Sequence, residues 1–146
     1  MNDKAIRIIP LGGLEAIGKN ITLFEYKDQI LIVDCGIMFP DDSAPGVDLI
    51  VPDFTYIEKN KEKIVGIAIT HGHEDHIGGI PFLLQIINVP IYASKLTIGL
   101  IKSRLEEFKP KNSPQFVEIA SRDIIHIGLF KIEFMKVNHS IIDGMS

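Results

Sequence analysis

The segment HGHEDH, residues 71–76, places histidines and carboxylates close together in the chain. His71 and His73 are two residues apart, so in an extended chain both imidazoles leave the same face and can bind one metal at ~2.0–2.1 Å. Asp75 and His76 follow where the chain turns toward a helix, and they can bind a second ion. Imidazole and carboxylate ligands suit zinc or manganese, and the segment has no thiolate for a structural zinc–cysteine site. A merely solvated polar loop is disfavoured, because the cluster follows an apolar strand, where α/β proteins place ligands.

Two residues outside this segment extend the candidate site. His139 follows an expected strand, and it could complete a three-histidine zinc site with His71 and His73 that leaves one position open for water. A histidine at such a place is otherwise a loop or capping residue, and the HGHEDH segment favours the ligand role. Asp34 ends a β-rich run, so it either orients a ligand histidine through its free N–H or begins a turn. His126 has no partner nearby in sequence, which predicts a structural role.

Hydrophobic patterning predicts the elements that must position these residues. The run 64–70 is short and apolar, as in a parallel strand that is covered on both faces. Residues 35–54 hold three prolines, two glycines and four aspartates, which indicates a long structured loop. Strands followed by strand–helix alternation indicate a mixed-sheet α/β layered fold. We expect strands over 5–10, 21–26, 29–34, 64–70, 90–93, 115–119, 124–127 and 130–137, and helices over 54–61, 80–88 and 94–110.

Composition excludes several classes of protein. The chain has 146 residues, 46% of them apolar and 23% charged, which is typical of one soluble globular domain. No apolar run approaches the ~18 residues of a membrane helix, the N-terminus does not read as a signal peptide, and Cys35 is the lone cysteine. We therefore expect a cytoplasmic protein with no membrane partner. The net charge of −4 does not indicate nucleic acid binding.

Several stretches of the sequence resemble a known family. HGHEDHIGG is similar to the H-x-H-x-D-H signature of the metallo-β-lactamase superfamily. PLGGLEAIGKN, DCGIMFPDD, GVDLIVPDFTY, THGHEDHIGGIPFLL and NHSIIDG, in this order, resemble the N-terminal part of the ribonuclease J family, the branch with an inserted β-CASP domain. The resemblance covers residues 6–144. The chain departs from the family at Glu15-Ala16, where members usually read G-E, and at Ile142, where they usually have proline.

This resemblance implies an α/β fold of the αββα sandwich type, with residues 1–146 forming its N-terminal, incomplete half. The β-CASP and C-terminal domains are then expected outside this segment, together with a bridging aspartate and a last histidine. The family holds two divalent metals, zinc in the first place and manganese as the alternative, and we expect at most one to bind tightly here. A structural cation is expected near Gly46 and Asp48. The family's metal ligands match this chain at His71, His73, Asp75, His76 and His139.

The activity implied by the resemblance is metal-dependent hydrolysis of RNA phosphodiesters, as 5′–3′ exonuclease, endonuclease or both, in rRNA processing and mRNA decay. Asp75 would bind one metal and orient or deprotonate the attacking water. RNA is the expected partner, with a homo-oligomer possible in a full-length protein, and we expect residues 1–146 alone to be inactive. Two alternatives stay open: another lactamase-type hydrolase acting on thioesters, lactams or other phosphodiesters, and a non-catalytic metal-binding domain.

Overall fold

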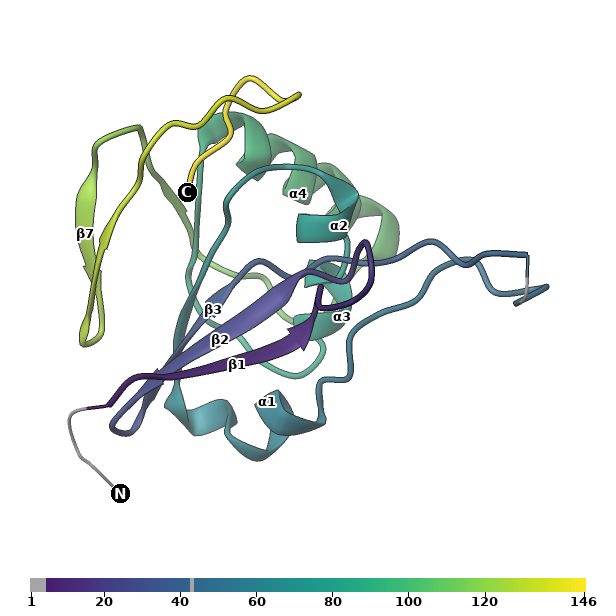
Figure 1. Cartoon of the computed structure of the whole chain (residues 1–146), viewed down its shortest axis with the longest axis horizontal. Coiled ribbons are helices and arrows are strands. Elements are labelled where there is room, and N and C mark those ends of the chain that lie inside the picture. Colours follow the sequence, from purple (N-terminus) through teal and green to yellow (C-terminus); the bar gives the residue numbers. More distant parts are fainter. Residues whose placement is uncertain (1–4, 43) are drawn as a thin grey trace.

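Within the described residues, six strands form a mixed sheet in the order β1-β2-β3-β4-β5-β6 (Figure 1). The computed structural model describes residues 5–42 and 44–146. The first three strands are antiparallel neighbours, and β3 to β6 run parallel. The strands are β1 Arg7–Gly12, β2 Ile21–Tyr26, β3 Gln29–Val33, β4 Ile64–Ala68, β5 Ile91–Ala93 and β6 Phe116–Glu118.

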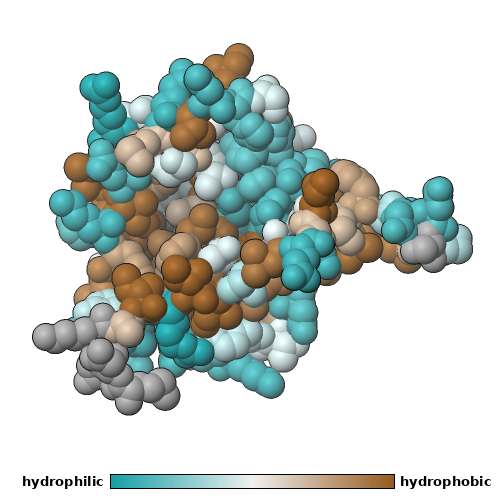
Figure 2. Space-filling model, in the orientation of Figure 1, coloured by the Kyte–Doolittle hydropathy of each residue, from teal (hydrophilic) through white to brown (hydrophobic). Residues whose placement is uncertain are grey.

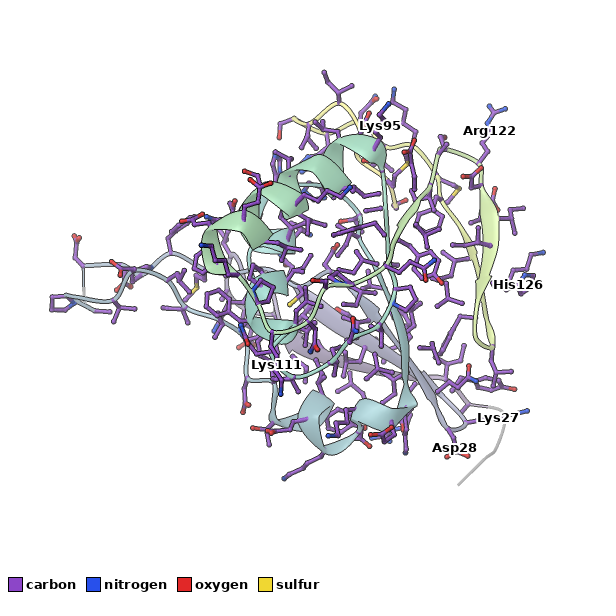
Figure 3. The ribbon with its side chains drawn as sticks, turned by 180° about the vertical axis from the view of Figure 1, so that it is seen from behind. Lys27, Asp28, Lys95, Lys111, Arg122 and His126 are labelled. Carbon is purple, nitrogen blue, oxygen red and sulfur yellow. The ribbon has the colours of Figure 1, made fainter. Side chains whose placement is uncertain are left out.

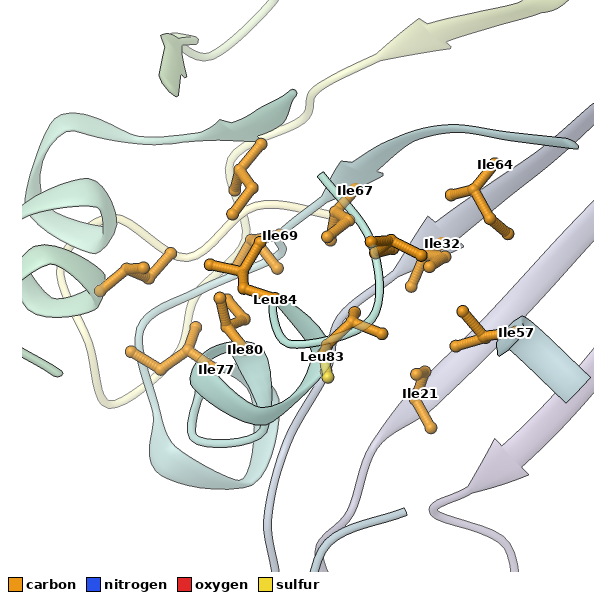
Figure 4. Packing of buried hydrophobic residues seen from close by; sticks show 14 of the residues in the cluster. Ile21, Ile32, Ile57, Ile64, Ile67, Ile69, Ile77, Ile80, Leu83 and Leu84 are labelled. Carbon is orange, nitrogen blue, oxygen red and sulfur yellow. The ribbon is translucent and has the colours of Figure 1, made fainter. Parts of the chain in front are cut away.

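Helices cover one face of this sheet. They are α1 Thr55–Lys59, α2 Glu74–Ile77, α3 Ile80–Leu83 and α4 Lys95–Phe108, with a 3₁₀ turn at Lys61–Lys63. Ser94 caps α4 by accepting a hydrogen bond from the Thr97 amide. The apolar side chains of the sheet and of the helices meet in one core, part of which Figure 4 shows. Its buried members include Ile21, Leu23, Ile32, Ile57, Ile67, Ile77, Ile80, Leu83, Leu84, Ile98 and Ile101.

A two-stranded sheet lies against the other face of the central sheet (Figure 1). Its antiparallel strands are β7 Ile124–Ile127 and β8 Phe130–Glu133. Alternate residues of β8 are half-buried, as the alternation of apolar and charged side chains predicts. A second core lies between the sheets, with Leu31, Ala68, Ile119, Ile127, Phe134 and Met145 buried in it. The chain therefore has the layered α/β architecture that the pattern of elements predicts.

Two predicted elements end well before their expected bounds, by four or five residues. The strand predicted over 130–137 ends at Glu133: Phe134 pairs with the turn before β7, and from Met135 onward the chain pairs with the C-terminal segment instead. Met135 N donates to Ser146 O at 3.0 Å, and Val137 N donates to Gly144 O at 3.1 Å. The helix predicted over 80–88 is regular only over Ile80–Leu83, and tighter turns follow it. The short helix α2, within the candidate metal segment, is not predicted as a separate element.

Apolar side chains lie exposed along the β1 edge of the sheet. Ile8 is 64% exposed and Ile6 is 57% exposed, and Figure 2 shows hydrophobic surface over the region of β1 and β2. In the part of the chain that the structure describes, no helix has both the length and the hydropathy to span a bilayer.

Candidate metal centre

Three histidines from distant parts of the chain converge on one point. Nε2 of His71 lies 3.0 Å from Nδ1 of His73 and 3.0 Å from Nε2 of His139. Two nitrogens bound to one tetrahedral zinc at ~2.0–2.1 Å are themselves about 3.3 Å apart. The observed separations are close to that value, so the three nitrogens fit a shared metal ion. Among the described residues they form a group whose ligand atoms all lie within 4.8 Å of one another.

The chain around these histidines explains the convergence. After β4, Ile69 N donates to Tyr92 O of β5, which extends the strand direction to the start of the HGHEDH segment. His71 is buried there, 7% exposed, whereas His139 lies on the surface. The C-terminal segment carries His139, and it is tied to the end of β4 because Met145 N donates to Thr70 O at 2.8 Å. The two ligand-bearing segments therefore meet at one end of the central sheet.

Asp34 holds His76 in place. His76 Nδ1 lies 2.8 Å from Asp34 Oδ2, so the imidazole donates to the carboxylate, while its Nε2 lies 3.2 Å from Asn20 Nδ2. The same carboxylate accepts from Thr70 N at 2.8 Å and from Thr70 Oγ1. Asp34 adopts a left-handed backbone with φ 60°, which aspartate tolerates better than most residues do. Of the two roles left open for Asp34, the geometry matches the orienting one.

Asp75 and His76 form a second pair beside the three histidines. Asp75 Oδ2 lies 3.4 Å from His76 Nε2, and the ring of His76 lies 4.0 Å from that of His71 between centroids. Asn20 Nδ2 donates to Asp75 Oδ2 at 3.0 Å and to the Asp75 carbonyl at 2.9 Å. Neither Asp75 nor His76 belongs to the three-nitrogen group described above. They are therefore neighbours of the first group, and Asp75 Oδ2 and His76 Nε2 both contact the side-chain amide nitrogen of Asn20.

Backbone contacts lock this pair to the loop that follows β3. Cys35 N donates to His76 O at 2.7 Å, and Gly79 N donates to Cys35 O at 2.9 Å. A side chain at Gly36 would overlap the backbone carbonyl of Asp75, so this approach requires glycine. The loop after β3 therefore sets the position of α2.

Burial and neighbouring charges change the protonation of two site histidines in opposite directions. Burial, reinforced by the neighbouring His76, lowers the pKa of His71 to about 4, so His71 is a neutral ligand at physiological pH. Burial also disfavours charge on His76, but the hydrogen bond to Asp34 and the charges of Asp34 and Asp75 outweigh it, and they raise the pKa of His76. Burial, followed by the charge of Asp34, raises the pKa of the Cys35 thiol, which leaves that thiol inert.

Two residues at the site have no role assigned from sequence. Thr70 bridges Asp34 and His71, and Asn20 holds Asp75. Thr70 immediately precedes the HGHEDH segment, and this position in the sequence could have identified it as a residue of the site. Asn20 had no such signal, since its partner lies 55 residues away.

The remaining predicted residues lie apart from the three histidines. Gly46 and Asp48 are exposed in the loop between β3 and α1, which projects from the body of the molecule (Figure 1). His126 is exposed on β7, opposite Lys131 in the register, on the outer side of the small sheet (Figure 3). Neither place belongs to the group of convergent nitrogens.

The fold, the geometry of the candidate metal site and the comparison with family models all indicate the same class of protein. The family model of the metallo-beta-lactamase superfamily matches residues 15–140, and the chain belongs to this superfamily. Its members bind divalent metal, which agrees with the convergence of His71, His73 and His139.

Curated relatives narrow the similarity to one kind of enzyme. Ribonuclease J of Mycolicibacterium smegmatis is 47% identical over 93% of this chain, and ribonuclease J of Synechocystis is 44% identical over 97%. Ribonuclease J of Thermus thermophilus is 45% identical over 95%. The chain covers 24%, 22% and 26% of these relatives respectively, so it spans about a quarter of their length.

Solved structures support the fold alone. The metallo-beta-lactamase fold protein YhfI from Bacillus subtilis superposes with a TM-score of 0.62 at 22% identity, over 94% of this chain and 55% of that protein. A protein of unknown function from Enterococcus faecalis gives a TM-score of 0.67 at 20% identity, over 96% of this chain and 39% of that protein. The predicted metallo-β-lactamase type of α/β fold is thereby confirmed.

Proposed function

We propose that this chain supplies the metal-binding part of a ribonuclease J-type enzyme that hydrolyses RNA phosphodiesters in the cytoplasm. The observation that carries the proposal is the convergence of His71 Nε2, His73 Nδ1 and His139 Nε2 on one point. The ribonuclease J relatives, 42–47% identical over nearly all of this chain, favour RNA over the other substrates of the superfamily. A homo-oligomer is part of the proposal for the whole protein.

Zinc is the metal that we propose for the three histidines. Three neutral imidazoles with one position open are the usual ligand set of a catalytic zinc, and manganese is the alternative. A metal held there would polarise a water molecule and the phosphate group that this water attacks. Asp75 and His76 would contribute to a second metal. Gly46 and Asp48, both exposed, are the residues proposed for a structural cation.

The residues of the chain prepare the site for this chemistry. Asn20 orients the Asp75 carboxylate, so that its oxygen can accept a proton from a water molecule beside the histidines. His71 is neutral at physiological pH and keeps a nitrogen lone pair for a ligand role. Asp34 holds the ring of His76 with Nε2 directed toward Asp75. These contacts fix the directions of the Asp75 carboxylate and the His76 ring before any substrate binds.

The first experiment measures metal content. Purified chain is equilibrated with zinc, freed of loose metal and examined by elemental analysis, with His139→Ala alongside. We expect about one tightly bound zinc per chain, since among the residues that the structure describes only these three histidines form a convergent set. The His139→Ala variant should lose it. Two tightly held ions per chain would contradict this assignment.

The second experiment tests the substrate. Residues 5–146 replace the matching part of the Thermus thermophilus ribonuclease J, and the chimera is assayed on end-labelled RNA, a thioester and a β-lactam. We expect zinc-dependent cleavage of RNA only, and no cleavage when the chimera carries His139→Ala. A chimera that folds and binds zinc but leaves RNA intact would refute the ribonuclease proposal, and turnover of another substrate would favour a different lactamase-type hydrolase.

A further inference from the structure

The hydroxyl group of Thr70 connects Asp34 with the metal-ligand candidate His71. Thr70 Oγ1 lies 2.9 Å from Asp34 Oδ2, 3.1 Å from Asp34 Oδ1 and 2.9 Å from Nδ1 of His71. The backbone of Thr70 donates to Asp34 Oδ1 and accepts from Met145 N, in the segment that carries His139.

We propose that Thr70 is a positioning residue: it sets the tautomer of His71 so that the Nε2 lone pair faces the metal. This inference rests on the metal binding proposed above.

The number of protons at this hydroxyl determines the direction of each hydrogen bond. A threonine hydroxyl has one proton to donate and two lone pairs that accept. The ionised carboxylate of Asp34 can only accept, so the hydroxyl proton of Thr70 goes to it. The contact between Thr70 Oγ1 and His71 Nδ1 must then be donated by the imidazole, because two lone pairs facing each other at 2.9 Å would repel. His71 is therefore protonated on Nδ1, and Nε2 keeps its lone pair.

That lone pair lies where the other ligands converge. Nε2 of His71 is 3.0 Å from both His73 Nδ1 and His139 Nε2. His76 follows the same arrangement directly: its Nδ1 donates to Asp34 Oδ2 at 2.8 Å, so in the neutral ring Nε2 keeps its lone pair, 3.2 Å from Asn20 Nδ2. One buried carboxylate thus orients two histidines, His76 by direct contact and His71 through the hydroxyl of Thr70.

The test begins with the unaltered chain. In zinc-free protein, at a pH above the ordinary pKa of histidine, nitrogen-15 NMR reports which ring nitrogen of each imidazole carries the proton. We expect the proton of His71 on Nδ1. A His71 protonated on Nε2 in the folded chain would overturn the proposal without any variant.

Variants then test whether the hydroxyl is responsible. Thr70→Val keeps the branched shape and removes the hydroxyl, Thr70→Ser keeps the hydroxyl, and Thr22→Val is the matched control on strand β2 of the same sheet. Zinc affinity is measured by competition with a chelator. We expect Thr70→Val to weaken zinc binding by about 10- to 100-fold and to shift the His71 proton from Nδ1. Thr70→Ser and the control should match the unaltered chain.

Two results with the variants would overturn the proposal. One is a Thr70→Val chain with unchanged zinc affinity and unchanged His71 resonances. The other is equal weakening in Thr70→Ser, because the loss would then follow from packing and not from the hydroxyl. If Thr70→Val does not fold, Thr70→Ala replaces it with the same expected results. These measurements use zinc alone, so failure of the chimera to cleave RNA would refute the ribonuclease function and leave the Thr70 proposal standing.

Discussion

Replacing Asp34 with asparagine tests how the metal centre is held together. Asparagine tolerates the left-handed backbone at this position as well as aspartate does, so the change adds no backbone strain. Its single oxygen can still accept from Thr70 N, but its NH₂ group then faces His76 Nδ1, a donor facing a donor. His76 must lose this hydrogen bond or carry its proton on Nε2, the nitrogen near Asp75. Either outcome damages the ligand geometry.

The effect on stability depends on pH in a defined direction. Burial disfavours the charged form of His76, and the hydrogen bond to Asp34 more than compensates, so the folded-state pKa lies above the unfolded value. The folded chain then binds more protons than the unfolded chain, and this stabilisation falls as pH rises. It is fully present below the unfolded pKa of about 6.5 and disappears as pH rises through the folded-state pKa of His76. A hydrogen bond to a charged group contributes about 1.5–3 kcal/mol.

We therefore expect Asp34→Asn to lower the free energy of unfolding by about 1.5–3 kcal/mol near pH 6, and by less near pH 9. Urea unfolding of zinc-free protein measures this difference, followed by circular dichroism because the chain has no tryptophan. Asp53→Asn is the control. Asp53 is exposed, and its hydrogen bonds with Thr55 lower its pKa, so it stays ionised across this range. A difference that grows toward pH 9, or one equal to that of the control, would refute the reasoning.

Four further predictions concern the site and its surroundings. His139→Ala should weaken zinc binding beyond the roughly 100-fold expected for a mere hydrogen-bond partner of a ligand, whereas His126→Ala should leave chelator competition unchanged. Gly36→Ala should destabilise the chain by roughly 3 kcal/mol in urea unfolding, because the new Cβ overlaps the carbonyl of Asp75. Gly99→Ala, which meets open space in α4, should stabilise it by roughly 0.5–1 kcal/mol. With a net charge of −4, the chain should bind RNA weakly at physiological salt, and a micromolar or tighter complex in a filter-binding assay would contradict this.

Local sequence patterns predicted correctly the strands that pair with a neighbour in the sequence. They were wrong where a strand pairs with a segment that lies elsewhere in the chain. The hairpin strands 21–26 and 29–34 match β2 and β3 to within one residue, because alternation and a short connection specify both. The strand predicted over 130–137 continues only to Glu133. Alternating side chains are compatible with either pairing partner, and the choice of Met145 and its neighbours over β7 depends on where the C-terminal segment returns.

The sequence alone identified the candidate metal ligands of the HGHEDH segment, because the spacing of ligands within six residues depends only on local backbone geometry. It also determined the layered α/β class through the order of apolar runs. Only the tertiary structure decided that His139 meets His71 across 68 residues and that Asp34 orients His76 across 42. It likewise decided that Thr70 stands between Asp34 and His71. Contacts between segments so far apart depend on how the layers pack, and no local pattern encodes the distances at which their side chains meet.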